Sequence, residues 1–276
     1  MNALEIRGLT KRRGDFTLQG LDLTLPAGCI MGLIGENGAG KSTTIRLILN
    51  ALSRDGGTVA VYGRDNRSLT PLEREDIGVV LDEVGLPEYM TARQIGRMLA
   101  GIFARWQPEV YESCLRRLAL PEDKPFRDFS RGMKMKLGLA AALSHQPKLL
   151  LLDEATSGLD PVVRDEILTI FSDFTRDEEH AVLISSHIVS DLEKICDYIA
   201  FLHRGRLLLC EEKDRLTEEY GLLRGGTEGI DPAAVCGRHA TPYGTEYLVR
   251  RSAVPAGVPL GQVNIEDLFV FMAKEA

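Results

Sequence analysis

A glycine-rich segment near the N-terminus carries the clearest chemistry in the sequence. It fits the pattern GxxxxGK[ST] at every fixed position, with the residues Gly35, Glu36, Asn37, Gly38, Ala39, Gly40, Lys41 and Ser42. Glycines let successive backbone amides converge on phosphate oxygens, because no Cβ atom stands in the way. In such a loop the lysine reaches the β- and γ-phosphates and the serine hydroxyl ligates Mg²⁺. The segment therefore predicts a site for a nucleoside triphosphate and Mg²⁺, with Thr43 as part of the cradle.

The residues on both sides of this loop match the context that phosphate binding requires. Residues 29–34 form a nearly continuous apolar run, which is typical of a strand buried on both faces. After the loop, apolar residues recur at helical spacing, at Ile45, Ile48 and Leu52. A helix N-terminus there adds about half a positive charge beside the phosphates. The alternative is a glycine turn with an incidental lysine, and the strand–loop–helix context argues against it.

A pair of adjacent carboxylates narrows the choice among kinases, GTPases and motor ATPases, which the loop alone leaves open. Asp153 and Glu154 directly follow the apolar residues 149–152. Acids at the end of such a strand are costly to desolvate without a cation or a donor nearby. We assign Asp153 to Mg²⁺, through water, and Glu154 to polarising the attacking water. The alternative is that the two acids only cap the next helix, and the presence of a phosphate loop in the same chain disfavours it.

The elements that must position these residues begin with short strands. Residues 4–6 and 21–25 alternate between apolar and polar, which predicts N-terminal β structure. Residues 89–143 have a mostly helical pattern. Their apolar stripe predicts core packing rather than a cofactor site, and it comprises Ile95, Met98, Leu99, Ile102, Phe103 and Trp106.

Strand and helix patterns then alternate up to about residue 209. Strands are expected at 149–152 and 182–185, helices at 162–174 and 188–195, and a hairpin at 198–209. We therefore expect an α/β fold of the P-loop NTPase type with a mostly parallel core sheet. An N-terminal antiparallel β subdomain, a helical insertion and a small C-terminal extension would complete it.

Composition and charge disfavour several classes of protein. The chain has 276 residues, of which 44% are hydrophobic, and this is enough for a sizeable core. A net charge of −7 disfavours nucleic acid as a partner. No apolar run approaches the ~20 residues that span a bilayer, and the N-terminus lacks a secretory apolar core, so we expect a cytoplasmic protein. The 5 cysteines lack CxxC spacing, which predicts reduced thiols.

Further motifs after Glu154 carry a family resemblance. Residues 155–161 read ATSGLDP, and the triplet Ser185-Ser186-His187 follows the next apolar strand. Together with the phosphate loop and LLLLDE at 149–154, these motifs make the chain resemble the ATP-binding subunit of ABC transporters, over about residues 3–216. The resemblance implies an ABC ATP-binding domain at residues 1–220, with a helical subdomain at about 86–143. Residues 221–276 would form a C-terminal accessory extension.

The resemblance also implies roles for residues outside the phosphate loop. The family's signature loop corresponds to FSRGM at 129–133. Its Ser130 hydroxyl and Gly132 amide would bind the γ-phosphate held by the opposite subunit, and Asp160 would cross the dimer interface. His187 matches the histidine that contacts the γ-phosphate and senses hydrolysis, although a lone histidine there is usually a packed or capping residue. Ser130 and Asp160 are also good N-caps of the helices that follow them.

Basic residues are concentrated at the start of the signature helix. Arg131, Lys134 and Lys136 occupy its first turns, although cations are unfavourable at the positive end of a helix. This pattern favours a polyanion that docks at that end. The alternative is that Lys134 and Lys136 lie on a solvated face of the helix.

Two positions depart from the family's usual pattern. Asp82 follows the apolar strand at 77–81, where the family usually has a glutamine that touches Mg²⁺. An aspartate can still ligate the metal, but it adds negative charge near the γ-phosphate, which bears on the hydrolysis rate and the metal dependence. Arg13 stands where the family usually has an aromatic residue that stacks on adenine. Its guanidinium plane can stack on a base, and Phe16 is close to it in sequence.

The resemblance implies an ATPase that acts within a complex. Two copies, as a homodimer, or this chain and a homologous one, as a heterodimer, would close around two ATP molecules, and hydrolysis would let them open. The subunit would sit on the cytoplasmic face of the membrane and act with a separate transmembrane permease. The spellings FSRGM at 129–133 and SSHIVSDLE at 185–193 resemble subunits of the bacterial type-2 exporter class, which implies export.

Two other functions stay open at this point. One is a soluble ABC ATPase that acts on ribosomes, DNA or cofactor assembly, although the sequence shows neither a second such domain nor a long coiled coil. The other is a nucleotide-sensing regulator with little turnover, which the departures at Asp82 and Arg13 favour. The transported compound would be selected mainly by the permease, so we expect no signature of it in this chain.

Overall fold

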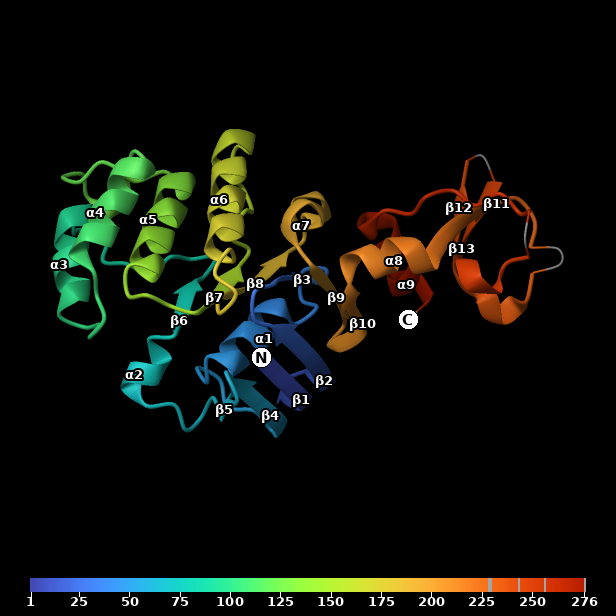
Figure 1. The fold of residues 1–276 in the computed structure, drawn as a ribbon, viewed down its shortest axis with the longest axis horizontal. Helices are drawn as coiled ribbons and strands as arrows, with labels where there is room; N and C mark the ends of the chain where they lie inside the picture. Colours follow the sequence, from blue (N-terminus) through green and yellow to red (C-terminus); the bar gives the residue numbers. More distant parts are fainter. Residues whose placement is uncertain (228–229, 243, 256, 276) are drawn as a thin grey trace.

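A mostly parallel sheet of six strands forms the centre of the computed structural model (Figure 1). The structure describes residues 1–227, 230–242, 244–255 and 257–275. The bounds of the six strands are β3 Ile30–Ile34, β6 Ile77–Val80, β7 Leu149–Asp153, β8 Ala181–Ser186, β9 Tyr198–His203 and β10 Arg206–Glu212. Their order is β10-β9-β3-β8-β7-β6, and only β10 runs antiparallel to its neighbour within this described sheet. The predicted core sheet is therefore confirmed.

The middle strands of this sheet are buried on both faces. Every residue of β3, β7 and β8 is buried, as the continuous apolar runs in the sequence predict. Because parallel strands end at the same edge of a sheet, the segments that follow these three strands meet there. They carry the phosphate loop, Glu154 and His187 respectively. The topology thus assembles the residues that the motifs select.

A second, antiparallel sheet packs near one face of the core. Its order is β2-β1-β4-β5, with the bounds β1 Asn2–Arg13, β2 Phe16–Pro26, β4 Gly56–Val61 and β5 Arg64–Asp65. Helix α1, Lys41–Ile48, joins both sheets, because its Ile45 packs in one apolar cluster with Leu23 and Met31. The expected N-terminal β subdomain is present, and it supports the helix that follows the phosphate loop.

Helices α6, Pro161–Phe174, and α7, Val189–Ile195, cover the other face of the core sheet (Figure 1). Alternate residues of β7 reach the two faces. Leu150 and Leu152 belong to the apolar cluster that contains α6 and α7. Leu149 and Leu151 belong to the cluster that contains α1. The core sheet is therefore covered on both sides, as a parallel sheet requires.

The helical insertion lies at one end of the molecule, beside β6 (Figure 1). It contains α3 Ala92–Ala100, α4 Pro108–Arg117 and α5 Arg131–Leu143, and the short helix α2 Pro71–Arg74 precedes it. Ile95 and Leu99 are buried, as the apolar stripe predicts. The prediction is wrong for Ile102, which is 65% exposed. Helix α3 ends at Ala100, so the helical spacing that would bury Ile102 is lost.

The C-terminal region forms a small sheet and a helix that returns to the core. Its elements are α8 Lys213–Glu219, β11 Tyr220–Arg224, β12 Val235–Thr241, β13 Gly244–Arg250 and α9 Ile265–Glu275, and the sheet order is β11-β13-β12. Helix α9 buries Ile265, Leu268 and Phe271 in the same cluster as α6 and α7. Phe269 adds a tilted ring contact with Phe201 of β9, at 5.3 Å between centroids. Helix α9 therefore ties the C-terminal region to the core of the ATP-binding fold.

Two further expectations concern membranes and thiols. Within the described ranges, none of the helices combines the length and the apolar character that crossing a bilayer requires. The cysteines Cys29, Cys114, Cys196, Cys210 and Cys236 are all free, and Cys196 is fully buried. Burial raises the pKa of the Cys196 thiol, so this side chain stays protonated and packs as a small apolar group.

Candidate nucleotide site

The phosphate loop borders a cavity of about 410 Å³ at the carboxyl edge of the core sheet. The loop leaves β3 and enters α1, as its motif requires. Residues from three other segments close the cavity, so the lining joins parts of the chain that lie far apart in sequence. It comprises Arg13, Phe16, Glu36, Asn37, Gly38, Gly40, Lys41, Ser42, Thr43, Asp82 and Glu154.

The glycines of the loop are required by close approaches and by backbone conformation. Gly40 has φ 114°, and a Cβ atom there would lie 2.7 Å from Cζ of Phe16. A Cβ atom on Gly35 would lie 2.4 Å from the carbonyl oxygen of Leu202, at the end of β9. Neither approach leaves room for a side chain. The Phe16 ring therefore packs directly on the loop, which places it at the nucleotide cavity.

Lys41 lies at the bottom of the loop and is almost fully buried. Its Nζ donates to the carbonyl oxygen of Gly35 at 2.7 Å. The same Nζ forms an ion pair with Oε1 of Glu154 at 3.1 Å. A buried ammonium needs such partners, and a phosphate could replace the Glu154 carboxylate as one of them. The lysine is thus positioned to exchange a protein anion for a nucleotide anion.

Glu154 is held between two cationic or potentially cationic groups. Its Oε2 lies 2.7 Å from Nδ1 of His187, while Oε1 faces Lys41. The Glu154 backbone has φ 52°, an uncommon conformation for a side-chain-bearing residue, and such strain clusters at functional sites. Its amide donates to Oγ of Ser185 at 3.1 Å. Glu154 and His187, which the motifs assign to hydrolysis, are therefore in direct contact.

Ser185 belongs to the triplet that precedes the family's histidine, but the motif gives it no role of its own. Its hydroxyl donates to Oδ1 of the buried Asp153 at 2.6 Å and accepts from the Glu154 amide. One hydroxyl thus orients both acidic residues. The available signal is register, because Asp153 and Ser185 pair directly across β7 and β8. This pairing follows from the strand alignment and not from local sequence.

The oxygen donors at the cavity fit Mg²⁺ bound together with phosphate. Ser42 and Asp82 line the cavity and offer a hydroxyl and a carboxylate, which are hard ligands that Mg²⁺ prefers. Asp153, which the sequence also assigns to Mg²⁺, is buried outside this lining and accepts a hydrogen bond from Ser185. Over the described residues, no group of three or more His, Cys, Asp or Glu side chains could hold a metal. Mg²⁺ ordinarily uses one or two carboxylates, waters and substrate phosphates, so a nucleotide would have to complete this site.

Ser130, Gly132 and Asp160 lie outside the lining of this cavity. The Ser130 hydroxyl accepts from the Met133 amide at 3.3 Å and caps α5. The Asp160 carboxylate accepts from the Val163 amide at 3.0 Å and caps α6. Both capping roles predicted from the sequence are present. The three residues therefore do not line the nucleotide cavity of their own chain.

The basic residues at the start of α5 each have a partner in the same chain. Lys136 pairs with Glu166 of α6 at 2.5 Å, and Lys134 lies over the Phe126 ring at 5.1 Å. Neither lysine is freely solvated, so the solvated-face alternative is wrong for Lys136, whose side chain is only 12% exposed. Arg131 pairs with Asp82. Among these three basic residues, Arg131 therefore connects the signature helix with the nucleotide cavity.

Comparison with known proteins places this geometry in a family. Residues 18–157 match the family described as ABC transporter. The bacitracin transport ATP-binding protein BcrA of Enterococcus faecalis is 34% identical over 208 residues, which cover 74% of this chain and 68% of that protein. The chain belongs to the ABC transporter family. It is an ATP-binding subunit of this family.

Two further ABC proteins show how much of the chain the likeness covers. The lantibiotic transport ATP-binding protein SrtF of Streptococcus pyogenes is 33% identical over 214 residues, covering 76% of this chain and 91% of that one. A solved ATP-binding subunit of an ABC transporter superposes with a TM-score of 0.69 at 26% identity. The match covers 78% of this chain and 92% of the solved one. The ABC fold therefore accounts for most of the chain.

Proposed function

We propose that this ABC subunit hydrolyses Mg-ATP with Glu154 as the residue that polarises the attacking water. The observation that carries the proposal is the Glu154 carboxylate, whose two oxygens contact Lys41 and His187 at 3.1 and 2.7 Å. When phosphate engages Lys41, one Glu154 oxygen is released to accept a proton from water. His187 would then keep the other oxygen oriented and contact the γ-phosphate. Bound Mg²⁺ would supply charge neutralisation, with Ser42, Asp153 and Asp82 as its protein donors.

We further propose that two subunits close face to face around the nucleotides. Ser130 and Asp160 are exposed near the cavity but outside its lining, so they are free to meet a second subunit. Val162, at the start of α6, is 76% exposed and adds an apolar side chain to this surface. The Ser130 hydroxyl and the Gly132 amide would bind the γ-phosphate held by the other subunit.

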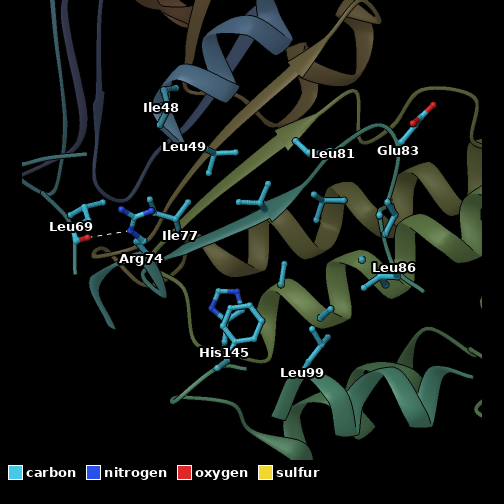
Figure 2. A pocket seen from close by; sticks show the side chains of 18 of the residues that line it. Ile48, Leu49, Leu69, Arg74, Ile77, Leu81, Glu83, Leu86, Leu99 and His145 are labelled. Carbon is cyan, nitrogen blue, oxygen red and sulfur yellow. Dashed lines mark hydrogen bonds between the residues drawn. The ribbon is translucent and has the colours of Figure 1, made fainter. Parts of the chain in front are cut away.

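An apolar groove supports the proposal that this chain binds a membrane-embedded partner. A cavity of about 520 Å³ lies between β6 and α5, and its lining is mostly aliphatic (Figure 2). Leu81, Leu86 and Leu99 line it, and Glu83 and His145 are among its few polar side chains. Gly138 of α5 keeps the groove open toward Val84, because a Cβ atom there would lie 3.0 Å from Cγ1 of that residue. We propose that a cytoplasmic helix of a separate permease docks here with its apolar face.

Export is the direction that the relatives favour. BcrA of Enterococcus faecalis is named for bacitracin transport and SrtF of Streptococcus pyogenes for lantibiotic transport. A daunorubicin/doxorubicin resistance ATP-binding protein of Streptomyces peucetius is 34% identical over 213 residues. We propose that this chain energises the outward transport of an amphipathic compound, acting from the cytoplasmic face of the membrane as a homodimer or a heterodimer.

The test of this assembly is recovery of the permease. The tagged chain is purified from detergent-solubilised membranes of its own organism, and co-purified proteins are identified by mass spectrometry. We expect a protein with several transmembrane segments to be retained by the wild type and by Lys41→Ala, and to be lost with Leu86→Glu or Glu83→Lys. Glu178→Lys is the matched control, since Glu178 is exposed outside the groove. Reproducible recovery of ribosomal proteins instead would contradict the transporter assignment.

A further inference from the structure

Arg131 and Asp82 form a salt bridge at the border of the nucleotide cavity. Nη2 of Arg131 donates to Oδ1 of Asp82 at 2.5 Å, and both side chains are about half exposed. Arg131 is the first residue of α5, where a cation is unfavourable because the helix N-terminus is already positive. The Asp82 carboxylate compensates this charge. The pair therefore joins a residue of the signature helix to a residue that lines the ATP site.

The position of Arg131 also connects it with the loop that follows Glu154. A Cβ atom built on Gly158 would lie 3.2 Å from Nε of Arg131, so the guanidinium rests against the backbone of that loop. Asp82 lies on a wall shared by the nucleotide cavity and a second cavity that Arg131 and Lys134 line. Whatever moves the Asp82 carboxylate toward the nucleotide therefore changes the surroundings of Arg131.

The salt bridge is suited to being broken and remade. Exposed ion pairs contribute little to stability, because water and salt screen them. Mg²⁺ bound to a triphosphate carries a concentrated charge that attracts a neighbouring carboxylate. Once Asp82 is engaged there, the Arg131 guanidinium loses its anion at an exposed helix start. A guanidinium in that position favours a phosphate, which it can bind through two parallel N–H groups.

We propose that the Asp82–Arg131 pair is a latch that ATP releases: Mg-ATP draws Asp82 into its own cavity, and the freed Arg131 binds the γ-phosphate held by the partner subunit. This inference rests on the proposed face-to-face dimer. It makes Arg131 a cross-subunit phosphate ligand in addition to the Ser130 hydroxyl and the Gly132 amide. It also gives a reason for a carboxylate at position 82, because an uncharged amide would hold the guanidinium less strongly before ATP binds.

If the latch operates, replacing Asp82 and replacing Arg131 should have opposite effects on ATP-driven dimerisation. Asp82→Asn keeps an oxygen that can ligate Mg²⁺ but removes the charge that holds Arg131, so dimers should form at lower ATP concentration. Arg131→Ala removes the phosphate ligand, so dimers should require more ATP. A purely structural salt bridge would behave differently, since breaking it from either side would have the same effect.

The experiment measures ATP-driven dimerisation by analytical ultracentrifugation in a Glu154→Gln background, which retains bound ATP. Mg-ATP is titrated against this variant alone and combined with Asp82→Asn, Arg131→Ala or Arg131→Lys. We expect the ATP concentration at half-dimerisation to fall at least threefold with Asp82→Asn and to rise at least tenfold with Arg131→Ala. Arg131→Lys should fall between Arg131→Ala and the background. Arg127→Ala, which removes a similarly exposed arginine just upstream, should leave the midpoint unchanged.

The outcomes separate this inference from the proposed function. If the Glu154→Gln chain dimerises with ATP and both latch variants shift the midpoint in the same direction, or neither shifts it, the latch is wrong and the dimer stands. If the Glu154→Gln chain binds a fluorescent ATP analogue but never dimerises, the proposed dimer fails and the latch fails with it. Circular dichroism establishes that each variant is folded, and Arg131→Lys tests the guanidinium geometry without deleting the charge.

Discussion

At the scale of single residues, the site is organised around the Glu154 carboxylate. Lys41, His187 and Ser185 each contact this residue through side chain or backbone. Lys41 comes from the phosphate loop, and the other two lie at or just after the end of β8. The motif spellings identify Lys41, Glu154 and His187, because their chemistry demands fixed local neighbours. Ser185 stands in one of these motifs, but its role depends on strand register, since its contact with Asp153 crosses between β7 and β8. The residues next to Ser185 in the sequence do not predict such a contact between strands.

Replacing His187 with alanine should slow hydrolysis without weakening ATP binding. The Nδ1 contact with Glu154 orients the carboxylate, and losing a positioned acid–base partner costs about 10²-fold or more in kcat. KM for ATP should change less than threefold, because the residues that line the cavity, Lys41 and Ser42 among them, are unaltered. Phosphate release under saturating Mg-ATP measures the effect. His180→Ala is the control, since that ring stacks on Phe174 away from the site. A fall in kcat of less than threefold would contradict the assigned role.

Phe16 is predicted to contribute to nucleotide affinity. Its ring packs on Gly40 and lines the cavity together with Arg13, so both planar groups are within the ATP site. Base stacking on an aromatic ring is worth about 1–3 kcal/mol, so Phe16→Ala should raise the Kd for ATP roughly tenfold. Isothermal titration calorimetry measures it, with Arg13→Ala as the companion variant. If Arg13→Ala weakens binding and Phe16→Ala does not, the guanidinium is the stacking group.

At the scale of elements, helices α6 and α7 are connected by an ion pair whose carboxylate is buried. Nε of Arg164 in α6 lies 3.5 Å from Oδ2 of Asp191 in α7, and the Asp191 side chain is 2% exposed. Arg164 also donates to the carbonyl oxygen of Leu159, in the loop before α6. The pair thus links the helix after His187 with the loop that carries Asp160. Each helix follows from apolar spacing, but the contact between them joins positions 27 residues apart, which periodicity does not address.

Breaking this buried pair from one side should destabilise the fold. Arg164→Ala would leave a buried carboxylate without a cation, and removing one partner of a buried pair costs about 3–5 kcal/mol. Urea unfolding followed by circular dichroism measures the free energy of unfolding. Arg117→Ala is the matched control: its exposed pair with Asp173 should be worth less than about 1 kcal/mol. Equal effects of the two substitutions would show that Arg164 and Asp191 do not support each other.

At the scale of the whole molecule, the C-terminal region packs more closely against the ATP-binding fold than the change in composition indicates. The change in composition after about residue 221 predicts an appended unit, and the small sheet of β11, β12 and β13 does extend away from the core (Figure 1). Helix α9 nevertheless returns and buries Phe271 in the cluster that contains α6 and α7. The sequence around α9 does not predict this contact, because the apolar face of a helix does not specify what it packs against.

The tail should therefore contribute to the stability of the ATP-binding fold. Phe271 is 2% exposed, and truncating a buried phenylalanine to alanine costs about 3–5 kcal/mol through lost contacts and the cavity that remains. Phe271→Ala should lower the urea midpoint followed by the fluorescence of Trp106, which lies in the helical insertion and packs against the same apolar cluster as Phe271. Leu72→Ala, at a side chain that is 55% exposed, should change stability by less than about 0.5 kcal/mol. An unchanged midpoint for Phe271→Ala would mean that the tail and core unfold independently.

The most direct test of the central claim compares Mg-ATP hydrolysis by the wild type and by Glu154→Gln, with bound nucleotide measured in the same samples. The substitution keeps the size of the side chain, but the amide that replaces the carboxylate cannot accept a proton from water. We predict that phosphate release falls at least about 10²-fold while ATP occupancy is retained. A wild type that hydrolyses ATP no faster than the variant, even with its permease present, would contradict the account and favour a nucleotide-sensing role.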